Sequence, residues 1–150
     1  MGGLIGVATS IKDGLATKTM VKAAGLCFLV GIDSCLKFER DTSINASVLI
    51  NITAFDGPTW STNANPRKVL LSIPYDSGTI KNVYAKNLLD ANDMQIYKDD
   101  SLNIYIKAMN AYSTVFVVEL IQPAGVFSNV KNTPLSSVND LESYEKITIH

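Results

Sequence analysis

The clearest pattern along the chain is an alternation of apolar and polar residues between positions 44 and 55. Every second residue of this segment is apolar, and these residues are Ile44, Ala46, Val48, Ile50, Ile52 and Ala54. The residues between them are mainly polar, with Leu49 and Phe55 as the exceptions. Because side chains of a β-strand point alternately to opposite faces, this period of two predicts a strand with one buried face.

Seven further segments have the apolar and β-branched character of strands and end at turn residues. They cover residues 27–32, 35–40, 69–73, 79–86, 94–98, 102–107 and 113–121. The last segment is apolar on both faces, which is typical of a central strand, and its Glu119 needs either a partner or an edge position. About eight short strands separated by turns predict an all-β fold, an antiparallel and jelly-roll-like β-sandwich.

The two ends of the chain differ from residues 26–127, which form the predicted β-sandwich domain. Residues 1–25 are expected to form a short helical or extended segment that needs a partner, because they lack the sustained heptads of a coiled coil. Residues 128–150 read as a polar tail that is irregular or loosely attached. A last short strand is also compatible with this tail, since Ile147 and Ile149 alternate with Thr148.

The composition supports the all-β prediction and excludes several classes of partner. The 150 residues include 36 Asn, Ser and Thr and 37 Val, Ile and Thr, a mixture that favours strands joined by polar turns. A net charge of −1 provides no basic field for nucleic acid. No apolar run approaches the ~20 residues of a membrane-spanning helix, and the first residues lack the pattern of a secretory signal. We therefore expect no nucleic-acid partner and no membrane insertion.

Candidate catalytic and metal-binding residues are few. His150 is the only histidine and the last residue, so we expect it to be solvated. Cys27 and Cys35 flank a predicted turn at residues 31–34, and a tight hairpin there would not place them opposite each other. Both are therefore expected to be free, buried thiols. With so few ligands, neither a metal nor a cofactor is expected.

Aspartates occur in pairs in two predicted turns, at Asp90 and Asp93 and at Asp99 and Asp100. Because Asp commonly hydrogen-bonds the local backbone, a role in the turns is the favoured interpretation. A weak calcium site that includes Asn92 is one alternative. A hydrolase that uses a carboxylate pair is another, but the favoured interpretation is that the chain is not an enzyme.

A candidate ligand site lies in the loop of residues 56–67, which has two prolines and little periodicity. Trp60 is the only tryptophan, and Asn63, Asn65 and Arg67 follow it closely. A flat aromatic surface beside amide and guanidinium donors suits a sugar ring, whose C–H face stacks and whose hydroxyl groups form hydrogen bonds. The alternative is that Trp60 packs against the end of the sandwich or in a subunit interface.

Two parts of the sequence resemble bacteriophage fibre proteins. The segment ATSIKDGLATK (residues 8–18) looks like a short element that precedes their distal domains. The segments LNIYIK (102–107) and YSTVFV (112–117) are similar to the closing strands of small trimeric jelly-roll fibre tips. The resemblance implies a homotrimer in the virion, an N-terminal segment that docks to other virion proteins, and a β domain that binds host-surface glycans without catalysis.

On this resemblance, the anchoring candidates in the N-terminal segment are Leu4, Ile5, Leu15 and Met20. The glycan-binding candidates are the loop residues Trp60, Asn63, Asn65 and Arg67. The alternative function is that of a carbohydrate-binding or adhesion module of a cell, also without catalytic activity.

Overall fold

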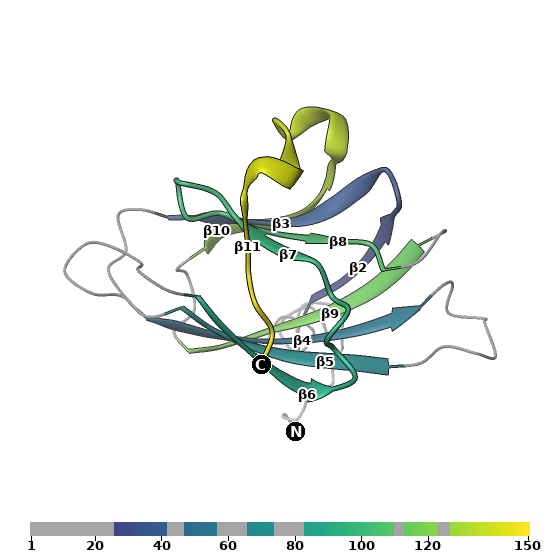
Figure 1. The fold of residues 1–150 in the computed structure, drawn as a ribbon, viewed down its shortest axis with the longest axis vertical. Coiled ribbons are helices and arrows are strands. Elements are labelled where there is room, and N and C mark those ends of the chain that lie inside the picture. The colour runs from purple at the N-terminus through teal and green to yellow at the C-terminus, as the bar shows by residue number, and fades with distance from the viewer. Residues whose placement is uncertain (1–25, 42–46, 57–65, 74–82, 110–112, 123–126) are drawn as a thin grey trace, which may run out of the picture.

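Two antiparallel sheets face each other in the computed structural model, which describes residues 26–41, 47–56, 66–73, 83–109, 113–122 and 127–150 (Figure 1). The first sheet contains β10 (Phe127–Pro134), β3 (Ser34–Arg40), β8 (Ile104–Lys107), β7 (Ile96–Lys98) and β11 (Glu145–Lys146), in that spatial order. The second sheet contains β2 (Leu26–Gly31), β9 (Ser113–Gln122), β4 (Val48–Asp56), β5 (Pro66–Ile73) and β6 (Tyr84–Leu89). The prediction of an all-β antiparallel sandwich is confirmed.

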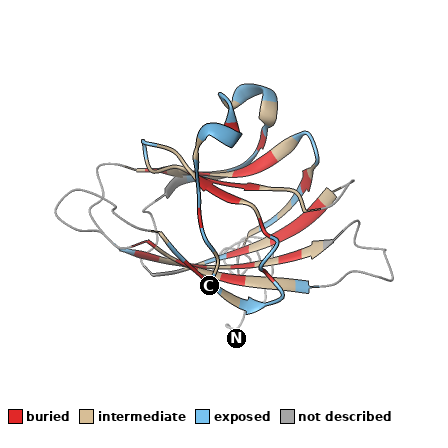
Figure 2. Ribbon diagram, in the orientation of Figure 1, coloured by how far each residue is buried: buried red, intermediate tan, exposed pale blue. Residues whose placement is uncertain are grey.

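The core lies between the facing sides of the two sheets (Figure 2). The predicted alternation holds in β4, where Val48, Ile50, Ile52 and Ala54 are all buried. The first sheet contributes buried residues from three strands, which include Leu36, Phe38, Ile96, Ile104 and Ile106. Burial of this apolar surface favours folding by roughly 25 cal/mol per Å².

Strand β9 occupies the central position that its two apolar faces predict. It pairs with β2 on one side and with β4 on the other. Its one acidic residue, Glu119, accepts a hydrogen bond from Asn51 Nδ2 on β4 at 3.2 Å. The carboxylate therefore has the partner that the sequence requires.

The expectation of an irregular tail after residue 127 is wrong. Residues Phe127–Pro134 form β10, which pairs with β3 from Phe127 to Pro134, with a shift of register between Phe127 and Asn129. Two short 3₁₀ helices follow, η1 (Leu135–Ser137) and η2 (Leu141–Ser143), and both lie over the outer face of the first sheet (Figure 1). The polar residues of β10 hid this strand because β10 is an edge strand whose exposed positions need no apolar side chain.

Residues 145–150 cross from the first sheet to the second (the yellow segment ending at C in Figure 1). They begin as β11, which pairs with β7, and Ile147 N then donates to Ile96 O at 2.8 Å. Ile149 forms a parallel bridge with Ala85 of β6. His150 completes this link, since its N donates to Ala85 O at 2.9 Å and its O accepts from Asn87 N at 2.8 Å.

We predict that Ile147→Ala lowers the free energy of unfolding by about 2–4 kcal/mol, because it leaves a cavity where Ile147 is only 4% exposed. Urea denaturation followed by circular dichroism measures this change. The adjacent, exposed Thr148 provides the control, since Thr148→Ala should change stability by no more than about 0.5 kcal/mol. Equal effects of the two substitutions would contradict the role of this segment in the core.

Candidate functional site

Arg67 is the one predicted glycan-binding residue that the structure describes. It lies at the start of β5, whereas Trp60, Asn63 and Asn65 lie outside the described residues. The Arg67 guanidinium forms a two-point ion pair with Asp93, with Nε–Oδ1 at 3.0 Å and Nη2–Oδ2 at 3.1 Å. Arg67 therefore does not offer the open set of donors that the sequence suggested. The four anchoring candidates, Leu4, Ile5, Leu15 and Met20, also lie outside the described residues.

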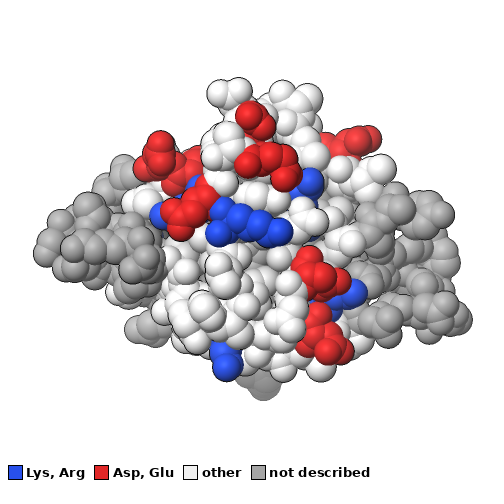
Figure 3. Space-filling view, in the orientation of Figure 1, with Lys and Arg blue, Asp and Glu red and all other residues white. Residues whose placement is uncertain are grey.

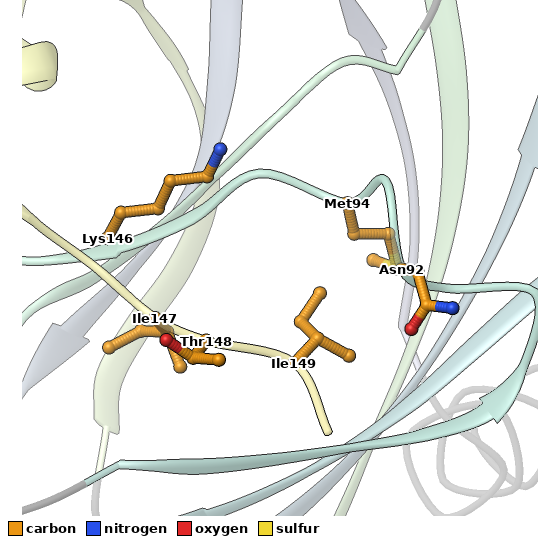
Figure 4. A pocket seen from close by; sticks show the side chains of 6 residues that line it. All are labelled: Asn92, Met94, Lys146, Ile147, Thr148 and Ile149. Atoms are coloured by element: carbon orange, nitrogen blue, oxygen red, sulfur yellow. The ribbon is translucent and has the colours of Figure 1, made fainter.

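A pocket of about 310 Å³ opens beside this ion pair, where residues 145–150 cross between the sheets (Figure 4). Its lining comes from two segments that are distant in sequence: Asn92 and Met94 before β7, and Lys146, Ile147, Thr148 and Ile149 near the end of the chain. Met94 and Ile147 are buried, while Asn92, Lys146 and Thr148 are exposed. The pocket thus combines an apolar floor with a polar rim, and no local sequence pattern predicts it.

The rim is positioned by hydrogen bonds within the turn before β7. Asn92 Oδ1 accepts from Asn87 Nδ2 at 3.0 Å, and Asn87 Oδ1 in turn accepts from Ala91 N at 3.0 Å. The next residue, Asp93, holds Arg67. These contacts fix the Asn92 amide at the edge of the pocket.

Charge around the pocket is mostly paired. On the face drawn in Figure 3, Lys and Arg side chains gather in a short band with acidic side chains around it. Lys98 pairs with Glu145 at 3.2 Å and Lys107 pairs with Glu142 at 3.1 Å. Lys146, which lines the pocket, has no carboxylate at ion-pair distance among the described residues, but its charge helps to lower the pKa of the nearby Glu142.

His150 is exposed, as its terminal position predicts, and it is also held against β6. Its ring stacks on Tyr84 of β6, with centroids 5.1 Å apart and an interplanar angle of 9°. Tyr84 nevertheless remains 49% exposed. Because His150 follows Ile149 directly, this aromatic pair begins one residue beyond the pocket lining.

Asp99 is a turn-forming residue, as predicted. Its Oδ1 accepts from the backbone N of Ser101 and of Asn103, both at 2.9 Å. Its Oδ2 accepts from Tyr105 Oη at 2.7 Å. Burial, together with this bond to the Asp99 carboxylate, raises the pKa of Tyr105. In the described part of the chain, no three His, Cys, Asp or Glu side chains come together in a way that could hold a metal ion.

The outer face of the first sheet is covered by the segment that contains η1 and η2. Leu141 packs there with Cys35, Tyr97 and Tyr105 in a second apolar cluster, separate from the main core. Glu142 ties this cover to the sheet, since it accepts from Lys107 Nζ at 3.1 Å and from Tyr97 Oη at 3.3 Å. The bond from Lys107 is the main cause of the lowered pKa of Glu142.

The outer face of the second sheet contrasts with this, because its edge strand β2 exposes apolar side chains. Leu29 is 60% exposed, and Cys27 is exposed on the same side of the strand. They stand beside Val115 and Val117 of β9, their register partners. Besides its pairing with β9, β2 takes part in one hydrogen bond to a side chain of the described residues. In this bond Asn132 Nδ2 of β10 donates to Leu29 O at 2.8 Å.

The two cysteines are free, as predicted, but only one of them is buried. Cys35 points into the covered apolar cluster on the first sheet, where burial raises the pKa of its thiol to about 11, against the opposing effect of Lys37 and Lys107. Cys27 lies on the exposed side of β2, so the expectation that it is buried is wrong. The sequence could not distinguish the two cysteines in this respect. Cys27 lies in a continuous apolar run, and such a run occurs both in strands buried on two faces and in this edge strand, which is covered on one face only.

We predict that an alkylating reagent at pH 8 modifies Cys27 and leaves Cys35 unmodified in the folded protein. Thiolate is the reactive form, and at pH 8 a thiol whose pKa is about 11 is almost wholly protonated as well as inaccessible. Mass spectrometry of the digested protein should show modification at Cys27 alone, and at both residues in urea. Cys27→Ser should abolish labelling of the folded chain, and rapid labelling of Cys35 would contradict the burial of the cluster.

No helix in the described residues is both long enough and apolar enough to span a membrane. No protein-family model and no curated protein matches the sequence. Among solved structures, the tailspike protein of Acinetobacter phage vB_ApiP_P1 is similar over 75% of this chain, with 15% sequence identity and a TM-score of 0.36. This chain spans 21% of the length of that tailspike chain. A TM-score this low does not establish a common fold, so the function is inferred from the residues of this chain.

Proposed function

We propose that this chain is a non-catalytic structural protein of a bacteriophage virion, which assembles as a homotrimer and contacts carbohydrate on the host surface. Residues 1–25 would dock to other virion proteins, with Leu4, Ile5, Leu15 and Met20 as the anchoring residues. The resemblance of residues 8–18, 102–107 and 112–117 to phage fibre proteins supports this proposal, and so does the all-β sandwich.

The exposed edge strand β2 is the observation that carries the homotrimer. An edge strand that exposes apolar side chains favours pairing with other chains, and monomeric proteins normally protect such edges with charges or covering segments. The edge at β6 has such a cover, because Ile149 is bridged to Ala85 and His150 hydrogen-bonds to the backbone of Ala85 and Asn87. At β2 the apolar Leu29 is 60% exposed instead. Closed symmetry would bury this surface once in every subunit.

The carbohydrate contact is assigned to the loop that contains Trp60, Asn63 and Asn65. Asp93 holds Arg67 at the end of this loop and thereby fixes where the loop rejoins the sandwich. An indole ring can stack on the C–H face of a sugar while the amides bind its hydroxyl groups. Three such sites on one trimer would raise the avidity for a repetitive glycan surface without any new contact.

Light scattering coupled to size-exclusion chromatography should give three times the 16.3 kDa chain mass. Leu29→Lys should shift the protein to monomers at micromolar concentration, because a buried unpaired ammonium at the interface is strongly unfavourable. Leu88→Lys is the matched control, since Leu88 is a similarly exposed leucine (48%) on the opposite edge strand β6. A monomeric parent protein, or equal effects of both substitutions, would rule out an interface at β2.

A glycan array tests the carbohydrate contact. Trp60→Ala should weaken binding to the recognised glycan at least tenfold, roughly 1.4 kcal/mol, whereas Trp60→Phe should retain part of the affinity because it keeps a stacking surface. Light scattering on each variant confirms that the oligomeric state is unchanged. Undiminished binding of Trp60→Ala would remove this loop from the proposed site.

A further inference from the structure

We infer that the pocket lined by Asn92, Met94 and residues 146–149 is a binding site for a single carboxylated sugar residue. This inference rests on the proposed carbohydrate-binding function and specifies the class of sugar. It also places a contact on residues of the sandwich that the structure describes.

The size and floor of the pocket suit one small ring. Its volume of about 310 Å³ lies at the lower end of ligand pockets, which range over roughly 300–1,000 Å³. Met94 and Ile147, respectively 2% and 4% exposed, provide an apolar floor together with the partly buried Ile149. A sugar presents an apolar C–H face that can lie on such a floor while its hydroxyl groups turn toward the rim.

The rim supplies the groups that a polyhydroxylated ligand needs. Figure 4 shows Asn92 and Lys146 on opposite sides of the pocket, with Thr148 on the crossing segment below them. The amide of Asn92 and the hydroxyl of Thr148 can each donate and accept hydrogen bonds, and the ammonium of Lys146 donates only. Two neutral groups and one cation therefore surround the floor.

The cation indicates an acidic ligand. The two neighbouring lysines on the first sheet, Lys98 and Lys107, are each paired with a glutamate, and Arg67 is paired with Asp93. Lys146 lines the pocket and has no carboxylate at ion-pair distance among the described residues. Its charge helps to lower the pKa of Glu142, but that carboxylate is bonded directly to Lys107. A carboxylate on the ligand would provide a direct ion-pair partner, as the internal glutamates do for Lys98 and Lys107.

One ammonium favours a single carboxylate over a phosphate or sulfate group. Sites for multiply charged anions typically use the fork of an arginine or several backbone N–H groups. Arg67 has its fork occupied by Asp93, which lies in sequence between the pocket-lining residues Asn92 and Met94. A uronic acid, which carries one carboxylate on a sugar ring, matches the charge and the hydroxyl-binding groups together.

The site is held rigid by the fold. Ile147 is hydrogen-bonded to β7 and Ile149 is bridged to β6, so Thr148 is fixed from both sides. The stacked Tyr84 and His150 continue the same segment and offer an exposed aromatic surface to an adjoining sugar of a polymer. Preorganised groups of this kind lose little conformational freedom when a ligand binds.

Nuclear magnetic resonance of the ¹⁵N-labelled full chain tests the inference with galacturonate and galactose, which differ at one carbon, carboxylate against hydroxymethyl. Galacturonate should shift the amide signals of Asn92 and residues 146–149, and galactose should bind there more weakly. Lys146→Gln should raise the Kd for galacturonate about three- to fivefold, the effect of one exposed ion pair, and leave that for galactose unchanged. Lys86→Gln removes an exposed lysine of β6 outside the pocket lining and should change neither value.

Three results would overturn the inference: no shifts in this group of signals, equal responses to galacturonate and galactose, or a galacturonate Kd that Lys146→Gln leaves unchanged. Acetate at the same concentration is a further control, and shifts equal to those with galacturonate would show a simple anion site instead. Failure here is distinguishable from failure of the proposed function. Glycan-array binding that depends on Trp60, without pocket shifts, would retain the function and reject this site.

Discussion

Closure of the sandwich by residues 145–150 is the constraint on which the rest of the structure depends. These residues hydrogen-bond to β7 of the first sheet and to β6 of the second, and Ile147 between them enters the core. Elsewhere the sheets meet mainly through apolar side chains, which attract without fixing direction, and Asn132 of β10 adds one hydrogen bond to Leu29 O of β2. Backbone hydrogen bonds to both sheets set their relative position on this side, and they also protect the edge of β6.

Much of the fold could be predicted because its main signal is local. The alternation over residues 48–54 and the two apolar faces of β9 each reflect burial along a single strand. The pairing of β10 with β3 could not be predicted in this way, since Lys131 and Asn132 are exposed on an edge strand and leave no apolar pattern. Nor could the pocket, because Asn92 and Lys146 meet only when the chain crosses between the sheets. The turn role of Asp99 needed no such contact and was predictable.

The outer faces of the two sheets differ in how far their apolar side chains are covered. On the first sheet, Leu141 and its neighbours cover Cys35, Tyr97 and Tyr105, and the ion pair between Glu142 and Lys107 fastens the cover at its edge. On the second sheet, the apolar side of β2 stays exposed at Leu29. In the described residues, the segment of residues 135–144 covers one sheet while Leu29 of β2 stays exposed on the other, and this contrast supports the proposed assembly.

The proposed assembly would compensate for weak binding at each proposed sugar site. A rim of one ammonium, one amide and one hydroxyl, all exposed to water, cannot bind a sugar tightly, because exposed ion pairs contribute only about 0–1 kcal/mol. Rigidity lowers the entropic cost of each contact, and the crossing segment provides it through hydrogen bonds to both sheets. Several copies of the site raise the avidity, since weak sites held at fixed spacing bind a repetitive surface far more strongly than any one of them. A trimer formed at β2 would leave β6 and the crossing segment, at the opposite edge of the second sheet, free to face that surface.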